Sequence, residues 1–142
     1  MEIIKDSFLI STDKEKLALE VIAKFLRSSY WAKGRSMDVI KKSIENSLCF
    51  GVYDNDKQIG FARFVTDYAT FAWLADVFIL DEYKGKGLGK WLMETIHDHP
   101  DLQTVHIWIL ATKDAHGLYA RYGYELLDKP ERLLRRKILK GD

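Results

Sequence analysis

The residues best suited to chemistry lie where a predicted strand passes into a predicted helix. An apolar run at residues 77–80 is followed by a polar turn, by glycines at alternate positions, Gly85, Gly87 and Gly89, and by a helical pattern that ends near His97. Glycine leaves backbone N–H groups uncovered, so several can converge on one anion, and the following helix adds the positive end of its dipole. The turn therefore predicts a phosphate-binding site, although glycines also occur at such turns for steric reasons alone.

Spacing excludes the two most familiar phosphate-binding motifs. A dinucleotide fingerprint needs glycine three residues beyond Gly87, and a P-loop needs glycine five residues beyond Gly85, but Lys90 occupies both positions. The hexapeptide Lys84-Gly85-Lys86-Gly87-Leu88-Gly89 instead resembles the [Q/R]-x-x-G-x-[G/A] motif of the GCN5-related N-acetyltransferase (GNAT) superfamily, with lysine in the first position. Residues 111–127, ATKDAHGLYARYGYELL, resemble the closing motif of that family, which carries L-Y-x-x-x-G-[F/Y] on a helix between two strands.

The resemblance implies acetyl-coenzyme A (acetyl-CoA) as co-substrate. In this family the glycine loop holds the pyrophosphate, and the preceding strand offers backbone groups to the pantetheine arm and the acetyl carbonyl. The matching residues are Val77, Phe78, Ile79, Lys84, Gly85, Lys86, Gly87, Leu88, Gly89 and Lys90. The three lysines are expected near the phosphates, unless they are simply solvated. Thr112 stands where many members carry a cofactor-contacting asparagine, and its alternative role is to cap a helix.

Acetyl transfer to an amine needs an acid that protonates the departing thiolate and a base that removes a proton from the amine. Tyr119 occupies the tyrosine position of the closing motif, which implies the general acid; otherwise it is one more aromatic residue on an amphipathic helix. Asp76 lies inside an apolar strand and is the candidate base, with a structural salt bridge as its alternative role. His106 and Asp67 are the other candidate bases.

The single cysteine, Cys49, lies in a β-like run and is predicted to be a buried structural thiol. A covalent route through Cys49 is therefore disfavoured, and direct attack in a ternary complex is expected. One cysteine excludes an internal disulfide and a cysteine-based zinc site, and no spacing of His, Asp or Glu suggests a metal site.

The acceptor pocket is predicted in an irregular loop that contains Tyr30, Trp31 and Arg35. Loops carry binding residues more often than rigid elements do, and Arg35 could hold a carboxylate bidentately. The alternative is that both rings cap the core and Arg35 is solvated. We expect a small-molecule amine as acceptor; an amine on a protein, or a non-catalytic acyl-CoA sensor, are the competing hypotheses.

Composition indicates one soluble domain spanning residues 1–142. The chain is 47% hydrophobic and 30% charged with a net charge of +1, so no overall field favours nucleic acid or an anionic membrane. No apolar stretch approaches the length of a membrane span, and the N-terminus lacks a signal-peptide pattern, which favours the cytoplasm. The basic residues near the C-terminus are typical of a terminal edge strand that is protected from aggregation.

Hydrophobic periodicity predicts an α/β (α+β) fold with helices against a central mixed sheet. The resemblance implies a GNAT-type sheet, mixed and mostly antiparallel, of six to seven strands flanked by about four helices. Helices are expected at residues 13–27, 36–46, 87–97 and 114–122, and strands at 8–11, 48–53, 58–66, from the 67–70 turn to 80, 102–110, 124–127 and 132–139. This order is also that of the GNAT fold. Because that family is often dimeric, the last strand could pair or exchange in a homodimer.

Overall fold

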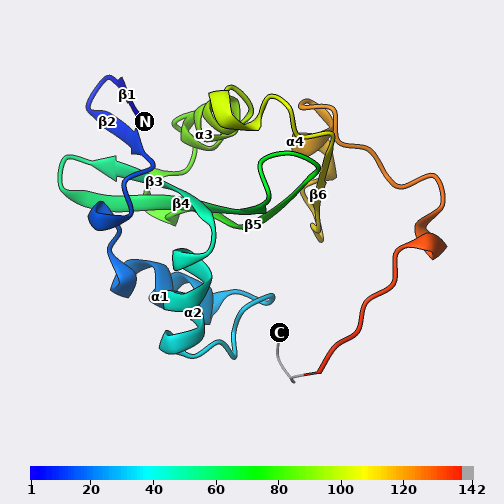
Figure 1. The fold of residues 1–142 in the computed structure, drawn as a ribbon. Coiled ribbons are helices and arrows are strands. Elements are labelled where there is room, and N and C mark those ends of the chain that lie inside the picture. Colours follow the sequence, from blue (N-terminus) through cyan, green and yellow to red (C-terminus); the bar gives the residue numbers. More distant parts are fainter. Residues whose placement is uncertain (139–142) are drawn as a thin grey trace.

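One mixed sheet of six strands organises the molecule (Figure 1). The computed structural model describes residues 1–138. The strands are β1 (Glu2–Lys5), β2 (Phe8–Ser11), β3 (Leu48–Asp54), β4 (Lys57–Thr66), β5 (Phe71–Ile79) and β6 (Ile107–Leu110), and the helices are α1 (Leu19–Ser28), α2 (Met37–Glu45), α3 (Leu88–His97) and α4 (His116–Ala120). The strands lie side by side in chain order, antiparallel except for the parallel pair β5 and β6. The predicted fold class, with the lower strand number, is confirmed.

Helices cover both faces of the sheet. Helix α3 lies on one face, whereas α1 and α2 lie on the other (Figure 1). The central strands therefore contribute to two cores: Phe50 and Phe64 pack on the α3 side, and Phe61 and Phe78 pack on the α1 and α2 side. This two-sided burial explains why β4 shows little alternation of apolar and polar residues.

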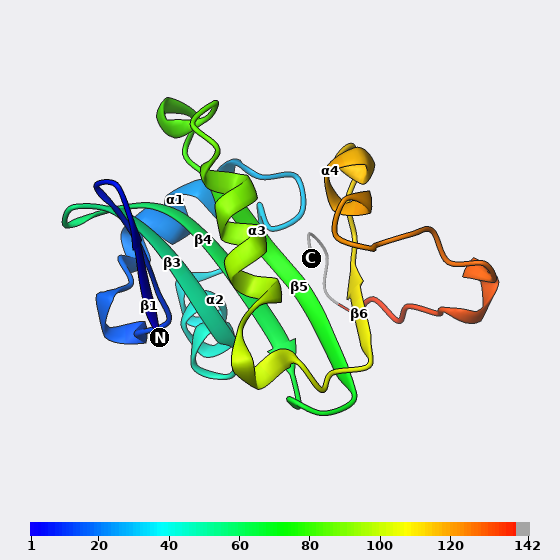
Figure 2. The same cartoon turned by 90° about the horizontal axis from the view of Figure 1, so that it is seen from above.

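Strands β5 and β6 pair over only part of β5. Phe71–Leu74 pair with Ile107–Leu110, and β5 then continues to Ile79 without β6 beside it. An irregularity interrupts the pairing of β4 with β5 between Phe61 and Arg63, opposite Asp76, whose φ is 55°. Beyond their last pair the two strands diverge, which opens the sheet between β5 and α4 (Figure 2).

The N-terminal part differs from prediction in two places. Glu2–Lys5 form a strand that pairs with β2, but its four side chains are exposed, so no apolar pattern marks it. The helix expected from residue 13 begins only at Leu19, after a 3₁₀ turn at Lys14–Lys16. The reason is a distant contact, because the Ala18 N–H donates to the Gln58 side chain at 2.7 Å and the backbone there is extended.

The C-terminal part differs more. Strand β6 is shorter than expected because a 3₁₀ turn at Pro100–Leu102 occupies the start of the predicted range, and α4 is shorter than residues 114–122. The strands expected at 124–127 and 132–139 are wrong in the described part of the chain, which shows no strand between residues 124 and 138; residue 139 lies outside it. This stretch, here termed the C-terminal segment, leaves the sheet as an extended arm (Figure 1, orange to red).

Cys49 is buried at 1% exposure, as predicted, and its thiol lies nearest the carbonyl oxygens of Ile44 and Ser47. Burial raises the pKa of this thiol to about 11, so the nucleophilic thiolate is scarce at neutral pH. A covalent route through Cys49 is therefore disfavoured. Within residues 1–138 the helices are all too short or too polar to cross a bilayer.

Phe64→Ala should lower the free energy of unfolding by about 3–5 kcal/mol, because the ring is fully buried and packs edge-on against Phe50 and Trp108. Its neighbour Val65 on the same strand is 42% exposed, so Val65→Ala should cost less than about 1 kcal/mol. Urea unfolding of both variants at pH 7 measures the difference. Equal losses would contradict the assignment of Phe64 to the core.

Candidate active site

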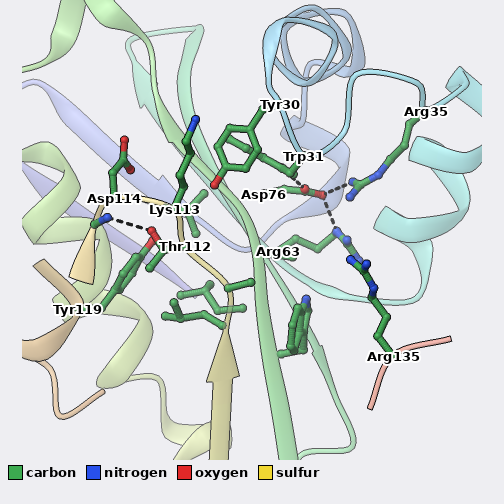
Figure 3. A pocket seen from close by; sticks show the side chains of 17 residues that line it. Tyr30, Trp31, Arg35, Arg63, Asp76, Thr112, Lys113, Asp114, Tyr119 and Arg135 are labelled. Atoms are coloured by element: carbon green, nitrogen blue, oxygen red, sulfur yellow. Dashed lines mark hydrogen bonds and ion pairs between the residues drawn. The ribbon is translucent and has the colours of Figure 1, made fainter. Parts of the chain in front are cut away.

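A cavity of about 620 Å³ opens where β5 and β6 diverge. Its walls come from four parts of the chain: the loop after α1, the second half of β5, the link from β6 to α4, and the C-terminal segment. The residues that line it are Tyr30, Trp31, Arg35, Arg63, Trp73, Leu74, Ala75, Asp76, Val77, Leu110, Ala111, Thr112, Lys113, Asp114, Ala115, Tyr119 and Arg135 (Figure 3).

The cavity brings together many of the residues singled out from the sequence. All three residues of the predicted acceptor loop line it, together with the four candidates Asp76, Val77, Thr112 and Tyr119. Phe78 does not, because its ring is buried on the other face and stacks on Phe25 with centroids 4.0 Å apart. The lining residues also do not include Ile79 or the glycine turn, so the predicted phosphate site lies apart from this cavity.

Asp76 is the centre of a buried hydrogen-bonded cluster. Its Oδ2 accepts from Arg35 Nη1 at 2.8 Å and from Arg63 Nε at 2.9 Å, and its Oδ1 accepts from Trp31 Nε1 at 2.9 Å. The Asp76 side chain is only 1% exposed. These contacts join β5 to the preceding strand β4 and to the loop after α1, whose two residues lie 41 and 45 positions away in the sequence.

The cluster keeps Asp76 ionised. Burial alone would raise its pKa, but the charges of Arg63 and Arg35 and the hydrogen bonds from Arg63 and Trp31 outweigh it, so the pKa lies below its ordinary value. A carboxylate with a lowered pKa is a weak base, so this environment favours the salt-bridge role over the role of general base. Arg63 was not singled out from the sequence, since an arginine within a strand is usually a solvated surface residue and its buried partner cannot be recognised from the sequence.

The acceptor loop presents two aromatic rings to the cavity. Tyr30 is 63% exposed and meets Trp31 edge-on, with centroids 5.2 Å apart. Lys113, from the link between β6 and α4, lies over the Tyr30 ring at 5.5 Å. Trp31 is held in place from both sides, because its indole also packs on Phe25 while its N–H donates to Asp76.

The glycine turn has the geometry of an anion cradle. Gly85 and Gly87 have φ values of 82° and 79°, and a Cβ on either residue would have no neighbour within 4 Å, so the backbone is open to solvent. Helix α3 begins without a side-chain cap, and its first intrahelical bond runs from the Trp91 N–H to the Gly87 carbonyl. The amides of the first turn therefore remain available to a bound phosphate, and these residues fit a pyrophosphate group.

The lysines of this turn are exposed and partly engaged with nearby carboxylates. Lys84 pairs with Asp81 at 2.8 Å, and Lys90 lies 4.0 Å from Glu94. Such exposed pairs are weak and a phosphate group can replace them.

Tyr119 lies on α4 in the wall of the cavity, and it also lines an adjoining apolar cavity of about 630 Å³. Burial raises the pKa of its phenol, with a smaller contribution from Tyr30, so Tyr119 is protonated at neutral pH. Nearby, the Thr112 hydroxyl accepts the Ala115 N–H at 3.0 Å, in the turn that precedes α4; it does not cap that helix.

A stack of rings fixes the position of α4. His97, at the end of α3, lies between Trp108 and Tyr122 with centroids 5.0 and 5.2 Å away. Burial lowers its pKa, so the ring is neutral: Nδ1 donates to the Met93 carbonyl at 2.6 Å, and Nε2 accepts from the Tyr124 hydroxyl at 3.0 Å. Tyr124 in turn packs against Tyr119, with centroids 5.8 Å apart.

The other candidate bases lie elsewhere. Asp67 closes the turn between β4 and β5, where hydrogen bonds from the Thr70 hydroxyl and nearby amides lower its pKa. His106 is exposed just before β6. Among residues 1–138, Asp76 and Asp114 are the only carboxylates that line the first cavity. The described part of the chain contains no group of three or more His, Cys, Asp or Glu side chains that could hold a metal ion.

Comparison with known proteins agrees with this geometry. The profile described as "Acetyltransferase (GNAT) domain" matches residues 45–126. A structure from Xanthomonas campestris described as belonging to the GNAT family is 42% identical, with a TM-score of 0.90 over 94% of each chain. An uncharacterized ycf52-like N-acetyltransferase from Prochlorococcus marinus is 32% identical, covering 82% of this chain and 67% of its own length.

A third relative shares the fold alone. It is a Clostridium acetobutylicum protein solved with acetyl-CoA, 10% identical, with a TM-score of 0.65 over 92% of this chain and 94% of that one. The matching profile extends from the end of α2 to beyond α4 and so includes the glycine turn, the diverging strands and Tyr119. The chain therefore belongs to the GNAT family of acetyltransferases.

Proposed function

We propose that this acetyltransferase uses acetyl-CoA to acetylate a primary amine by direct attack, with Tyr119 as general acid. The observation that carries the proposal is the position of Tyr119, which faces the open edge of β5 across the cavity that also holds the acceptor loop. An acyl thioester supplies the acetyl group. The role of the chain is to bind it, to orient the amine and to protonate the thiolate.

The cofactor would bind along α3 and β5. The uncapped amides of α3 and the turn at Gly85 and Gly87 would hold the pyrophosphate, with Lys84, Lys86 and Lys90 nearby. The β5 edge beyond Leu74, which β6 leaves open, would offer its backbone groups at Val77, Phe78 and Ile79 to the pantetheine arm, and Thr112 would contact it from the facing wall. The cofactor-bound relative from Clostridium acetobutylicum supports acetyl-CoA as the donor.

The acid would be the Tyr119 phenol. A raised pKa keeps it protonated through the neutral range, and the proton is lost only as the pH rises above the ordinary value of 10. A phenol of this basicity is a suitable donor to an alkyl thiolate.

For Asp76 we propose a positioning role in place of the base expected from its sequence context. Its carboxylate is occupied by Arg35, Arg63 and Trp31, which places these three side chains at the cavity. The cavity volume of about 620 Å³ favours a small-molecule acceptor, held between Tyr30, Trp31 and Arg35.

We also propose that the protein is a homodimer joined through the C-terminal segment. Five apolar side chains of this segment are strongly exposed: Leu126, Leu127, Leu133, Leu134 and Ile138. Within residues 1–138, β6 ends the sheet and its outer edge is unpaired. A second copy would satisfy both features, because the C-terminal segment of each copy could pack its apolar side chains against the free β6 edge of the partner.

Tyr119→Phe should lower kcat by about 10²- to 10⁴-fold in an assay of coenzyme A release, because it removes the acid. Acetyl-CoA should still raise the melting temperature of this variant as it does for the wild type, since binding is unchanged. Tyr68→Phe, in the exposed turn before β5, is the matched control and should keep full activity. Full turnover by Tyr119→Phe would remove the proposed acid, and the absence of both turnover and stabilisation by acetyl-CoA would argue against the enzyme.

Asp76→Asn should lower the free energy of unfolding at pH 7 by about 3–5 kcal/mol, because two buried guanidinium groups lose their counter-charge. The folded-state pKa of Asp76 lies below 3.8, so its stabilisation is present above that pH and is lost as the pH falls further. The gap between wild type and variant, measured by urea unfolding, should therefore shrink from pH 7 to pH 3. Asp56→Asn in the exposed hairpin turn is the control, and a gap that does not depend on pH would contradict the ionised cluster.

Light scattering after gel filtration should give the mass of two chains for the wild type. Leu126→Glu combined with Leu134→Glu should give one chain, because both side chains are exposed in the segment that we assign to the interface. Val39→Glu introduces the same charge at an exposed apolar position on α2 and should leave the mass unchanged. A wild-type protein that stays monomeric at high concentration would rule out the homodimer.

A further inference from the structure

The buried cluster contains one more positive charge than negative charges. Arg35 and Arg63 both bind the same oxygen of Asp76, and their side chains are only 16% and 11% exposed. Two guanidinium groups thus share one carboxylate at a depth where charges are normally compensated. The cluster carries a net charge of +1 and lies at the wall of an open cavity.

The two arginines also retain unused donors. A guanidinium has five N–H groups. Arg63 uses Nε on Asp76 and Nη1 on the Ser47 hydroxyl, and the side chain of Arg35 donates, among the described residues, to Asp76 alone. Donors that line a cavity without a protein acceptor are the groups that bind an oxyanion with fork geometry.

Further cations approach the same space. Lys113 and Arg135 line the cavity with the two buried arginines, and Arg135 reaches in from the C-terminal segment (Figure 3). Among the described residues, the second carboxylate that lines the cavity is that of Asp114, which is exposed and lies on the opposite side of the cavity from Arg35 (Figure 3). It cannot supply the missing charge at the arginine cluster.

We propose that the acceptor is a primary amine that also carries an oxyanion, a carboxylate or a phosphate, and that this oxyanion binds Arg35 and Arg63. This inference rests on the proposed function, because it names the substrate class of the same site. The anion occupies the unused guanidinium donors and neutralises the excess charge. The amine then extends along the cavity toward the β5 edge and Tyr119, with Tyr30 and Trp31 beside the rest of the molecule.

Matched acceptors test the charge requirement in the wild-type enzyme. Coenzyme A release is measured with L-amino acids of several side chains, each beside its carboxamide and its decarboxylated amine, and with phosphoethanolamine beside ethanolamine. The anionic member of at least one set should have a kcat/KM about 10- to 100-fold higher than its neutral partners. The two arms also distinguish a carboxylate from a phosphate. Equal or better turnover of the neutral partners would overturn the inference and leave the acetyltransferase activity standing.

Variants assign the effect to the cluster. Arg35→Gln leaves Arg63 and Asp76 as a balanced pair, so the ratio of kcat/KM for the anionic acceptor to kcat/KM for its neutral partner should fall by about 10- to 100-fold. Arg35→Lys keeps the charge without the planar fork of donors, so its ratio should lie between those of the wild type and Arg35→Gln. Arg27→Gln removes an exposed charge outside the cavity and is the control. A uniform loss over anionic and neutral acceptors would assign Arg35 to structure alone.

A binding measurement separates failure of this inference from failure of the proposed function. N-acetylated amino acids and N-acetylphosphoethanolamine are products of the proposed reaction. The tryptophan fluorescence of the protein follows their binding, since two of its four tryptophans, Trp31 and Trp73, line the cavity. At least one of these anions should cause a saturable change in fluorescence. Its Kd for the wild type should be lower by about tenfold or more than the Kd of its neutral analogue, and lower by a similar factor than its own Kd for Arg35→Gln. If no amine is turned over, anion binding of this kind still supports the site, whereas equal binding of anionic and neutral compounds overturns it.

Discussion

The ion-paired carboxylate of Asp76 is the interaction on which the site depends. Asp76 adopts φ 55°, which is unfavourable for a residue with a side chain, at the point where the pairing of β4 with β5 is interrupted. Two guanidinium groups and an indole N–H hold it there. The same contacts fix the loop after α1 against the sheet, so one buried anion determines both the irregular course of β5 and the position of the acceptor loop.

The rest of the site follows from the way β5 is used on its two sides. Up to Leu74 it pairs with β4 and β6, and beyond that residue only β4 remains as its neighbour. The free edge continues into the glycine turn and the uncapped start of α3, which places open backbone groups along one line. The facing wall is α4, held by the contact of Tyr124 with His97. Under the proposed function, backbone groups would face the cofactor, and side chains from several elements would face the acceptor.

Local features of this arrangement could be predicted from the sequence. The strand, the three glycines and the following helix are contiguous, so their geometry depends on neighbours in the chain, and the same holds for the helix that carries Tyr119. Asp76 was also recognisable as unusual, because a carboxylate in an apolar strand needs a partner. That partner could not be identified, since Arg63 meets it only through strand pairing and Arg35 only through the docking of a loop.

The remaining errors have the same origin in distant contacts. Gln58 delays the start of α1 by binding the Ala18 N–H across 40 positions of the chain. The C-terminal segment has the composition of a strand, yet a strand forms only where a neighbouring edge accepts its hydrogen bonds. Within the described chain, residues 124–138 pair with no strand, although the outer edge of β6 is free. Patterns of residues therefore predicted which segments can be strands, and the three-dimensional pairing decided which of them are.

The chain order of the sheet also has a consequence for folding. Strands β3, β4 and β5 follow one another through short turns, so they can form early as a meander with little loss of loop entropy. The parallel pairing of β5 with β6 must instead wait until α3 has crossed the sheet, and it rests on four residue pairs. We therefore expect β6 and α4 to dock last and to open first, which would make the wall that carries Tyr119 the least cooperative part of the molecule.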